Sequence, residues 1–201
     1  MIKPTLRTAA LLVLAAVLAT GAPVPASAAP GPSDGRPAAA TAPGVAGIAG
    51  WSRMDYADPR DEIQIFVDAH GLFTPRGGRT GPALSWGTFR IQHSMGAKDG
   101  EPASFNWGDF TVDCVRVDGP DVAVTGRIVD AGPGWQIFLN RERPARMGLS
   151  FHVPAPGAGA TRIGITPPAP DGQPELPMCS TWAPDADALG GAYTVTDTRR
   201  H

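Results

Sequence analysis

The sequence predicts an all-β domain, an antiparallel barrel or sandwich of about eight to ten short strands with one disulfide. Apolar and polar residues alternate with a period of two through most of the chain after residue 45, which places the apolar side chains on one face of a sheet. Gly- and Pro-rich turn sequences separate these runs. No stretch keeps a helical apolar period over about ten residues, so the pattern does not support parallel strands joined by crossover helices.

The first four expected strands carry the clearest alternation. Residues 63–69 have isoleucine, valine and alanine at every second position, and residues 89–95 have phenylalanine, isoleucine, histidine and methionine in the same way. Residues 110–115 follow with phenylalanine, valine and cysteine on the apolar parity, which leaves Val115 on the polar one. Residues 122–128 carry valines and an isoleucine. Each run predicts a strand with one buried face.

Shorter alternating runs complete the expected set at residues 135–139, 147–153, 162–166 and 192–196. The joining sequences at 99–102, 118–121 and 131–134 contain Asp-Gly or Gly-Pro and are typical of connections between antiparallel neighbours. Residues 184–189 are expected to form one helical turn.

The N-terminus has the pattern of a secretory signal peptide over residues 1–28. Lys3 and Arg7 precede an uncharged apolar run at 9–19, and Ala-Ser-Ala at 26–28 fits a cleavage site. The apolar run is about 11 residues, against the roughly 20 that span a bilayer, so no stable membrane insertion is predicted. We therefore expect a secreted, extracellular protein with a disordered Pro/Ala-rich linker at 29–44 and a single all-β domain at 45–201.

The charge balance argues against some partners. The full chain has 17 basic and 19 acidic residues, and removing the two basic residues of 1–28 leaves 15 against 19, a net charge of −4. Nucleic acid and anionic membranes both need concentrated positive charge, so neither is the expected partner. A small molecule or an extracellular polymer stays open as a partner.

Cys114 and Cys179 are the two cysteines of the chain. In an oxidising compartment they most simply form one structural disulfide, which would stabilise the domain by about 4 kcal/mol in the chain-entropy treatment. The alternatives are a pair of metal ligands or free thiols, and the absence of a short Cys-x-x-Cys spacing weakens the first.

Histidine and carboxylate side chains are the candidates for acid–base or metal chemistry. Asp68 and His70 would share a strand face, and His93 or His152 with Asp113 could complete a cluster if the strand register allowed it. The plainer interpretation places Asp68 and His70 on a solvent face, with His152 exposed. No catalytic residue, metal ligand or cofactor is assigned.

His93 lies on the apolar parity of its strand, where a buried imidazole needs a hydrogen-bond partner. It is either a satisfied histidine of the core or barrel rim, or a polar contact in a ligand cavity. We retain His93 as a possible ligand contact. No Gly-x-Ser-x-Gly elbow and no phosphate-binding loop is present, so the sequence favours a non-enzymatic protein.

Two further groups have alternative interpretations. The loop at 140–146 holds three arginines and could bind an anionic polymer or a carboxylate, although a solvated connection neutralised by nearby acids is the simpler expectation. Most of the five tryptophans are expected in the core or at its rim, whereas coplanar exposed ones would form a sugar-stacking platform. They are Trp51, Trp86, Trp107, Trp135 and Trp182.

Several segments together resemble a family of secreted actinobacterial all-β proteins of uncharacterised function. They are 87–93 (GTFRIQH), 110–115 (FTVDCV), 124–126 (VTG), 146–151 (RMGLSF), 176–179 (LPMC) and 191–195 (GAYTV). The resemblance covers about residues 85–198 and implies a secreted, disulfide-linked β-domain without a known activity. We expect an extracellular binding or structural module. The alternatives are a β-barrel that binds or acts on a small apolar molecule and a carbohydrate-binding module.

Overall fold

The computed structural model describes residues 43–74 and 81–200. The chain divides into two compact units, Met1–Ala38 and Ala39–His201, and the described residues all belong to the second. The predicted signal peptide at 1–28 lies outside the described residues, as does the predicted linker at 29–44 except for its last two positions.

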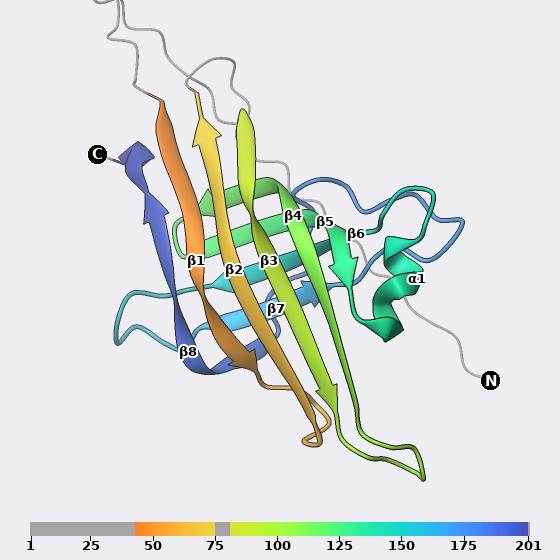
Figure 1. Ribbon diagram of the computed structural model, residues 1–201. Coiled ribbons are helices and arrows are strands. Elements are labelled where there is room, and N and C mark those ends of the chain that lie inside the picture. The colour runs from red at the N-terminus through yellow and green to blue at the C-terminus, as the bar shows by residue number, and fades with distance from the viewer. Residues whose placement is uncertain (1–42, 75–80, 201) are drawn as a thin grey trace, which may run out of the picture. The chain divides into compact units, whose positions relative to one another are not determined.

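Eight antiparallel strands of the described chain form one closed barrel, in which each strand pairs with the next and the last pairs with the first (Figure 1). The strands are β1 (Gly44–Met54), β2 (Asp61–Phe73), β3 (Leu84–Met95), β4 (Ser104–Asp118), β5 (Asp121–Ala131), β6 (Arg146–His152), β7 (Arg162–Thr166) and β8 (Ala186–Asp197). Short helical turns are η1 (Pro133–Trp135) and α1 (Gln136–Leu139) between β5 and β6, and η2 (Thr198–Arg200) after β8. The predicted all-β antiparallel fold is confirmed, as a barrel and not a sandwich.

Three local expectations are wrong. The strand expected at 135–139 is the turn η1 followed by α1, because Pro133 starts a helical turn and Trp135 packs edge-on against Phe138 one turn later. Residues 184–189 do not form a helical turn, since β8 already begins at Ala186. Strand β1 was not expected, because its first half consists mainly of glycine and alanine.

Large side chains fill the barrel interior. Phe89 of β3 and Phe110 of β4 stack with ring centroids 4.4 Å apart. Phe151 of β6 meets Tyr193 of β8 at 4.8 Å, although these strands are not neighbours. The interior of an eight-stranded barrel is just wide enough either for its own side chains or for one small ligand. Here the side chains occupy it, which does not favour the alternative of an apolar ligand inside the barrel.

A β-bulge at Asp113 changes the parity of β4. Val112 pairs with Gly126 and Cys114 with Thr125, so Asp113 has no partner of its own in β5. The extra residue turns Asp113 and Cys114 toward the outer surface and returns Val115 to the core, where it is fully buried. The sequence-based assignment of Val115 to the polar face is therefore wrong.

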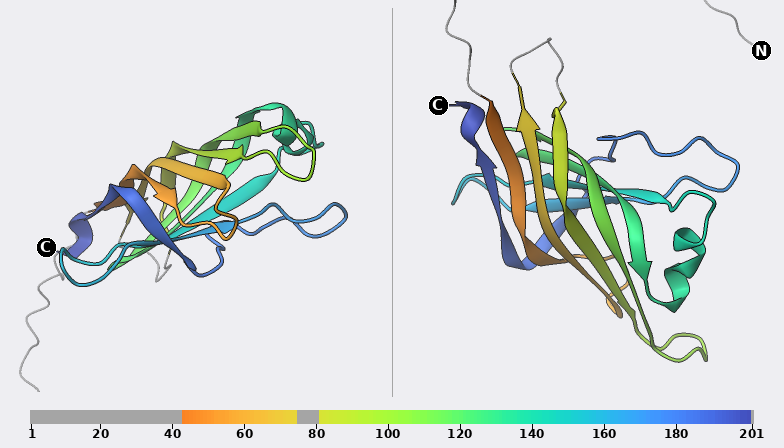
Figure 2. Two further views of the ribbon diagram at one scale, coloured as in Figure 1. Left: turned by 90° about the horizontal axis from the view of Figure 1, so that it is seen from below. Right: turned by 45° about the horizontal axis from the view of Figure 1, so that its top comes forward.

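The connection between β7 and β8, residues 167–185, is here named the strap (Figure 2). Strand β7 pairs with β8 at only two positions, Arg162 with Asp187 and Ile163 with Ala186. Beyond that seam the strap lies against the outside of β6 and β7, and the Trp182 backbone N–H donates to Thr166 Oγ1 at 2.7 Å.

Candidate functional site

Exposed aromatic side chains gather on the outer face of β1, β2 and β3. We name Trp51, Phe66, His70 and Trp86 the aromatic strip. The pairing register aligns Trp51 of β1 with Phe66 of β2, and His70 of β2 with Trp86 of β3. Trp51 is 46 % exposed and Trp86 41 %. The expectation that most tryptophans lie in the core fails for these two and for Trp182.

The rings of the aromatic strip form two nearly parallel pairs. Trp51 and Phe66 have centroids 6.0 Å apart and planes inclined by 19°. His70 and Trp86 have centroids 5.5 Å apart and planes inclined by 24°. Phe66 and His70 are four residues apart on β2, which corresponds to about 13 Å along an extended strand. Two stacked aromatic pairs therefore lie along one face of the sheet, each with part of its ring surface exposed.

Glycine makes room for one of these rings. A Cβ atom at Gly47 of β1 would lie 3.0 Å from His70 Nδ1 and 2.4 Å from the Ala69 carbonyl oxygen. The imidazole thus lies over the backbone of β1. This explains the glycine at position 47, whereas Gly44 lies against Arg199 and Gly50 against the Ala192 carbonyl oxygen.

A groove of about 460 Å³ runs beside the Trp51–Phe66 pair. Its walls include Phe66, Asp68, Thr88 and Arg90, and Asp109 lies on the far side. Arg90 Nε and Nη2 donate to the two carboxylate oxygens of Asp109. That hydrogen bonding raises the pKa of Arg90 further, so the guanidinium stays charged.

The guanidinium of Arg90 also lies over an aromatic ring. Its central carbon is 4.9 Å from the ring centroid of Trp107, which is half-buried on β4. A planar cation stacked on an indole and held by a carboxylate has few rotamers left. Arg90 therefore presents a fixed hydrogen-bond donor to the groove.

Asp68 and His70 share the outer face of β2, as expected, and His70 Nε2 lies 2.7 Å from Asp68 Oδ1. The cluster that we considered around them does not form, since His152 Nδ1 pairs with Asp121 Oδ1 at 2.7 Å and Asp113 pairs with Arg146. Within residues 43–74 and 81–200 no three His, Cys, Asp or Glu side chains are placed to hold a metal ion.

His93 lies on the inward parity of β3 at one end of the barrel. Its Nε2 atom is 3.0 Å from Asp61 Oδ2 on β2, and its ring meets Tyr56 edge-on at a centroid distance of 5.7 Å. The side chain is 17 % exposed. This is the satisfied rim histidine of the simpler interpretation, and its role as a ligand contact stays a prediction.

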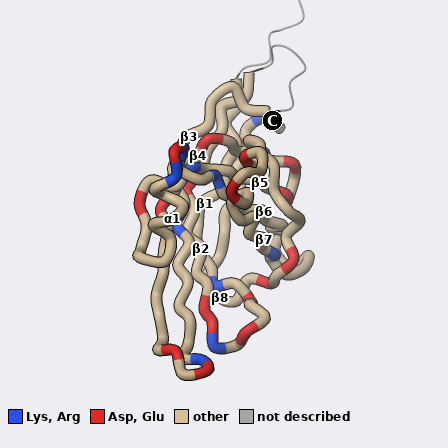
Figure 3. The backbone as a smooth tube through the Cα atoms, turned by 90° about the vertical axis from the view of Figure 1, so that its right-hand side faces the viewer, with Lys and Arg blue, Asp and Glu red and all other residues tan. Residues whose placement is uncertain are grey.

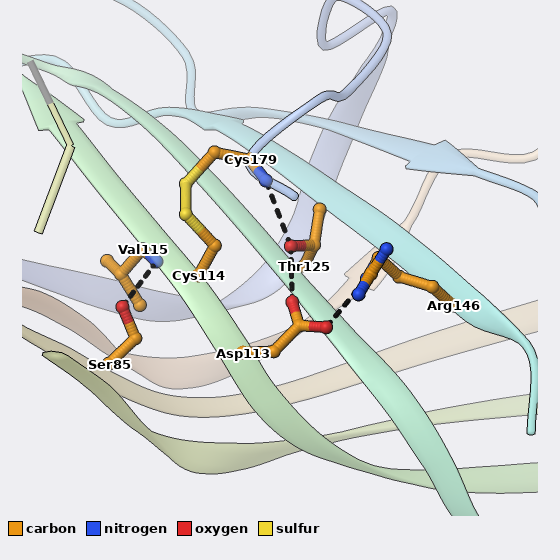
Figure 4. The surroundings of a disulfide bond; sticks show 7 residues. All are labelled: Ser85, Asp113, Cys114, Val115, Thr125, Arg146 and Cys179. Carbon is orange, nitrogen blue, oxygen red and sulfur yellow. Dashed lines mark hydrogen bonds and ion pairs between the residues drawn. A yellow bond between two sulfur atoms is a disulfide. The ribbon is translucent and has the colours of Figure 1, made fainter. Parts of the chain in front are cut away.

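The disulfide Cys114–Cys179 joins the strap to β4, as predicted (Figure 4). The Cys179 backbone N–H donates to Thr125 Oγ1 at 3.1 Å, and that hydroxyl donates to Asp113 Oδ1 at 2.7 Å. Arg146 Nε donates to Asp113 Oδ2 at 2.6 Å. The bulge therefore places a carboxylate and a cysteine together on the surface that the strap covers.

The arginine-rich loop at 140–146 serves mainly to hold the strap. Arg146 is nearly buried and also donates to the Leu176 carbonyl at 2.7 Å. Arg141 donates to the Ala169 carbonyl at 3.0 Å and pairs with Asp171. The expectation of a solvated connection is wrong for both, and it holds for the exposed Arg143.

Sequence reasoning missed the aromatic strip, although it contained a signal. Phe66 lies on the polar parity of its strand, where a large apolar side chain must face solvent. Trp51 gave no such signal because β1 itself was not expected. The contact between Arg90 and Trp107 depends on strand register, which a single sequence does not determine.

No protein-family model, curated protein or solved structure significantly matches the chain. The family resemblance noted from the sequence stays a prediction. Among the described residues, no helix has the length and hydropathy that a membrane crossing requires. Lys and Arg positions are interspersed with Asp and Glu positions along the backbone on the side drawn in Figure 3.

Proposed function

We propose that this domain is a secreted, non-enzymatic module that binds a neutral extracellular polysaccharide along the aromatic strip. The observation that carries the proposal is the exposed, nearly parallel pair of Trp51 and Phe66 beside a groove lined by hydrogen-bonding side chains. Flat aromatic faces pack against the C–H faces of sugar rings, and fixed polar groups at their edge bond the hydroxyls.

The second aromatic pair indicates that the ligand is a polymer and not a single sugar. His70 and Trp86 extend the same face by about 13 Å along β2, further than one ring contact needs. Asp68 and Thr88 lie between the two pairs and offer a carboxylate and a hydroxyl. An extended chain lying along the strands would meet both aromatic surfaces and the polar side chains between them.

The charges support a neutral ligand. The positive charge of Arg90 is compensated by Asp109, so no unpaired cation in the groove attracts an anionic polymer, and the exposed Asp68 carboxylate beside it would repel one. The disulfide indicates an oxidising compartment. Together with the sequence pattern of residues 1–28 it supports secretion, and hence an extracellular ligand.

Retention by polysaccharides tests the proposal. The purified protein is run through native gels cast with hydroxyethylcellulose, soluble xylan or laminarin, and is mixed with insoluble cellulose and chitin. We expect retention by at least one neutral polymer, and weaker retention by polygalacturonate. Trp51→Ala and Trp86→Ala should each weaken binding to that polymer by about tenfold or more, as truncation of a central aromatic contact does.

Ile137→Ala is the matched control, because it removes an exposed apolar side chain from α1, outside the aromatic strip. Circular dichroism of each variant checks that the barrel is intact. The proposal is wrong if none of these neutral polymers retains the wild-type protein, or if the two tryptophan variants bind as well as the Ile137→Ala variant.

A further inference from the structure

A trough of small residues crosses the outer surface of β4 to β7. The register aligns Arg116 of β4 with Ala123 of β5, Ala123 with Ser150 of β6, and Ser150 with Gly164 of β7. The side chains of Ala123 and Ser150 are small, and the space over Gly164 is taken by the strap backbone at Ala183 and Pro184, so the open part of the trough lies over Ala123 and Ser150. Strand β4 begins beside β3 and then turns into the wall of β5 to β7, which lies behind β1 to β3 in Figure 1, so the trough is separate from the aromatic strip.

The two long sides of the trough differ. On one side the strap covers the next row of residues, and a Cβ atom at Gly148 would lie 2.9 Å from Thr181 Cγ2. On the other side runs a charged row, in which Asp121 of β5 pairs with His152 of β6. The trough is thus bounded by the strap and by polar side chains, and it forms a pocket of about 370 Å³. This volume lies in the usual range of small-molecule sites.

Trp182 forms part of the strap wall of this pocket. It is 62 % exposed, although its backbone is fixed by the hydrogen bond to Thr166 Oγ1. The disulfide at Cys179 fixes the strap three residues earlier. A large indole held on a fixed backbone and exposed to solvent beside a pocket is available for stacking on a ligand.

Ser150 gives an independent indication of a ligand. The residue is 4 % exposed, and its Oγ atom is buried with no hydrogen-bond partner in the described structure. A buried hydroxyl without a partner costs about 1–3 kcal/mol, so native proteins seldom keep one. Ser150 lies in the pocket wall beside the strap residues Ala183 and Pro184, and a small displacement of the strap would let a ligand hydroxyl supply the missing bond.

The remaining polar groups define the ligand class. Arg116 at one end of the trough has no ion-pair partner among the described residues, so its guanidinium is free to donate. Asp118 and Asp121 also line the pocket, and Asp121 is paired there with His152. One cation beside two carboxylates does not attract an anion, whereas donors and acceptors next to an indole suit a neutral, hydroxyl-rich molecule.

We propose that this pocket is a second saccharide site, which takes one or two neutral sugar units between Trp182 and the trough. The proposal rests on the proposed function for its ligand class alone. Trp182 stacks on the sugar ring, while Arg116 and Ser150 bond its hydroxyls. The disulfide acquires a role in binding, because it holds the strap that carries the indole.

The experiment follows the tryptophan indole N–H signals by NMR. The chain contains five tryptophans, and Trp182→Ala assigns the signal of interest by its loss. The Trp51→Ala/Trp86→Ala double variant, which lacks the strip tryptophans, is titrated with cellobiose and with N,N′-diacetylchitobiose. We expect at least one of them to shift the Trp182 signal saturably, at concentrations up to about 100 mM, which reaches weak binding of single sugars.

Two further variants separate binding from stability. Ser150→Ala should weaken the disaccharide severalfold without lowering thermal stability, because it removes a buried hydroxyl that has no partner. Replacing both cysteines with alanine should abolish the Trp182 shift. If the Trp182 signal shows no saturable shift with either disaccharide, or if Ser150→Ala leaves the affinity unchanged, the second site is wrong.

The outcomes distinguish this proposal from the proposed function. Polymer retention that depends on Trp51 and Trp86, with no response of Trp182, would remove the second site alone. A saturable Trp182 shift, with polymer retention unchanged by the strip variants, would remove the strip and leave this site in place.

Discussion

The Tyr193 hydroxyl of β8 donates to the backbone carbonyl oxygen of Ile65 in β2 at 3.0 Å, across the intervening strand β1. Ser52 Oγ of β1 lies 3.0 Å from the same phenolic oxygen. Since the phenolic hydrogen is given to Ile65, Ser52 donates to Tyr193. One side chain therefore links three consecutive strands of the barrel from the inside.

This linkage makes the domain sensitive to alkaline pH. Burial raises the pKa of Tyr193 from its ordinary 10.0 to about 12, and the bond from Ser52 offsets part of that rise. A folded pKa above the unfolded one means that the stabilisation is complete below pH 10 and is lost as the pH rises toward 12. Urea unfolding between pH 8 and 12 should show this decline, and Tyr193→Phe should remove it while costing about 1 kcal/mol at pH 8.

Absorbance at 295 nm provides a direct check, because the chain has only two tyrosines. Tyr56→Phe leaves Tyr193 as the single phenol. If that phenol ionises near pH 10 in the folded protein, the interpretation of its burial is wrong.

Loss of the disulfide should destabilise the domain. The bond closes a loop with a sequence separation of 65, for which the chain-entropy treatment gives about 4 kcal/mol. Cys114→Ala/Cys179→Ala should therefore unfold at clearly lower urea concentration. Intact mass spectrometry of the unreduced wild type should find no thiol to alkylate. An unchanged unfolding midpoint would contradict the prediction.

The ion pair between Asp113 and Arg146 should contribute more to the free energy of unfolding than an exposed ion pair does. Arg146 is nearly buried, and breaking such a pair from one side typically costs about 3–5 kcal/mol. Arg146 keeps Glu175 as a second partner at 3.2 Å, so we expect Asp113→Asn to cost less than that, about 2 kcal/mol, in urea unfolding. Asp171→Asn removes the exposed partner of Arg141 and should cost at most about 1 kcal/mol. Equal effects of the two changes would show that burial does not decide their strength.

Gly87 should tolerate no side chain. Its φ is +117°, and a Cβ atom would lie 2.0 Å from the Asp68 carbonyl oxygen. Gly87→Ala should destabilise the domain by at least about 3 kcal/mol, because β2 and β3 would have to separate. Gly100 has a φ of +88° with open space around it, so Gly100→Ala should cost only the conformational strain of about 1–2 kcal/mol. A thermal melt of both variants compares the two costs.

The sequence predicts the strands whose alternation is produced by burial on one face. Strands β2, β3 and β5 fall in this class, since valine and isoleucine at alternate positions have no better explanation. Strand β1 shows no such alternation because its first half is mainly glycine and alanine, and its glycines lie against His70, Ala192 and Arg199. Those contacts join β1 to other segments, so local periodicity cannot show them.

The register of the strands explains most of the remaining differences between the sequence-based predictions and the structure. The bulge at Asp113 shifts the parity of Cys114 and Val115, and no residue type in that run marks the extra position. In the candidate site, too, only contacts within one strand could be predicted. Asp68 and His70 lie on the same strand and were predictable as neighbours. The meeting of His70 with Trp86 required the pairing of β2 with β3.

The barrel can close only after its last strand, β8, has been synthesised. Strand β8 pairs with both β1 and β7, and Cys179 lies only seven residues before it begins. During synthesis, β1 to β7 can form hairpins in order, but the sheet keeps two open edges until Ala186–Asp197 emerges. Until then those edges can pair with other chains. A truncation within β8 would therefore leave a chain prone to aggregation, and not merely a less stable barrel.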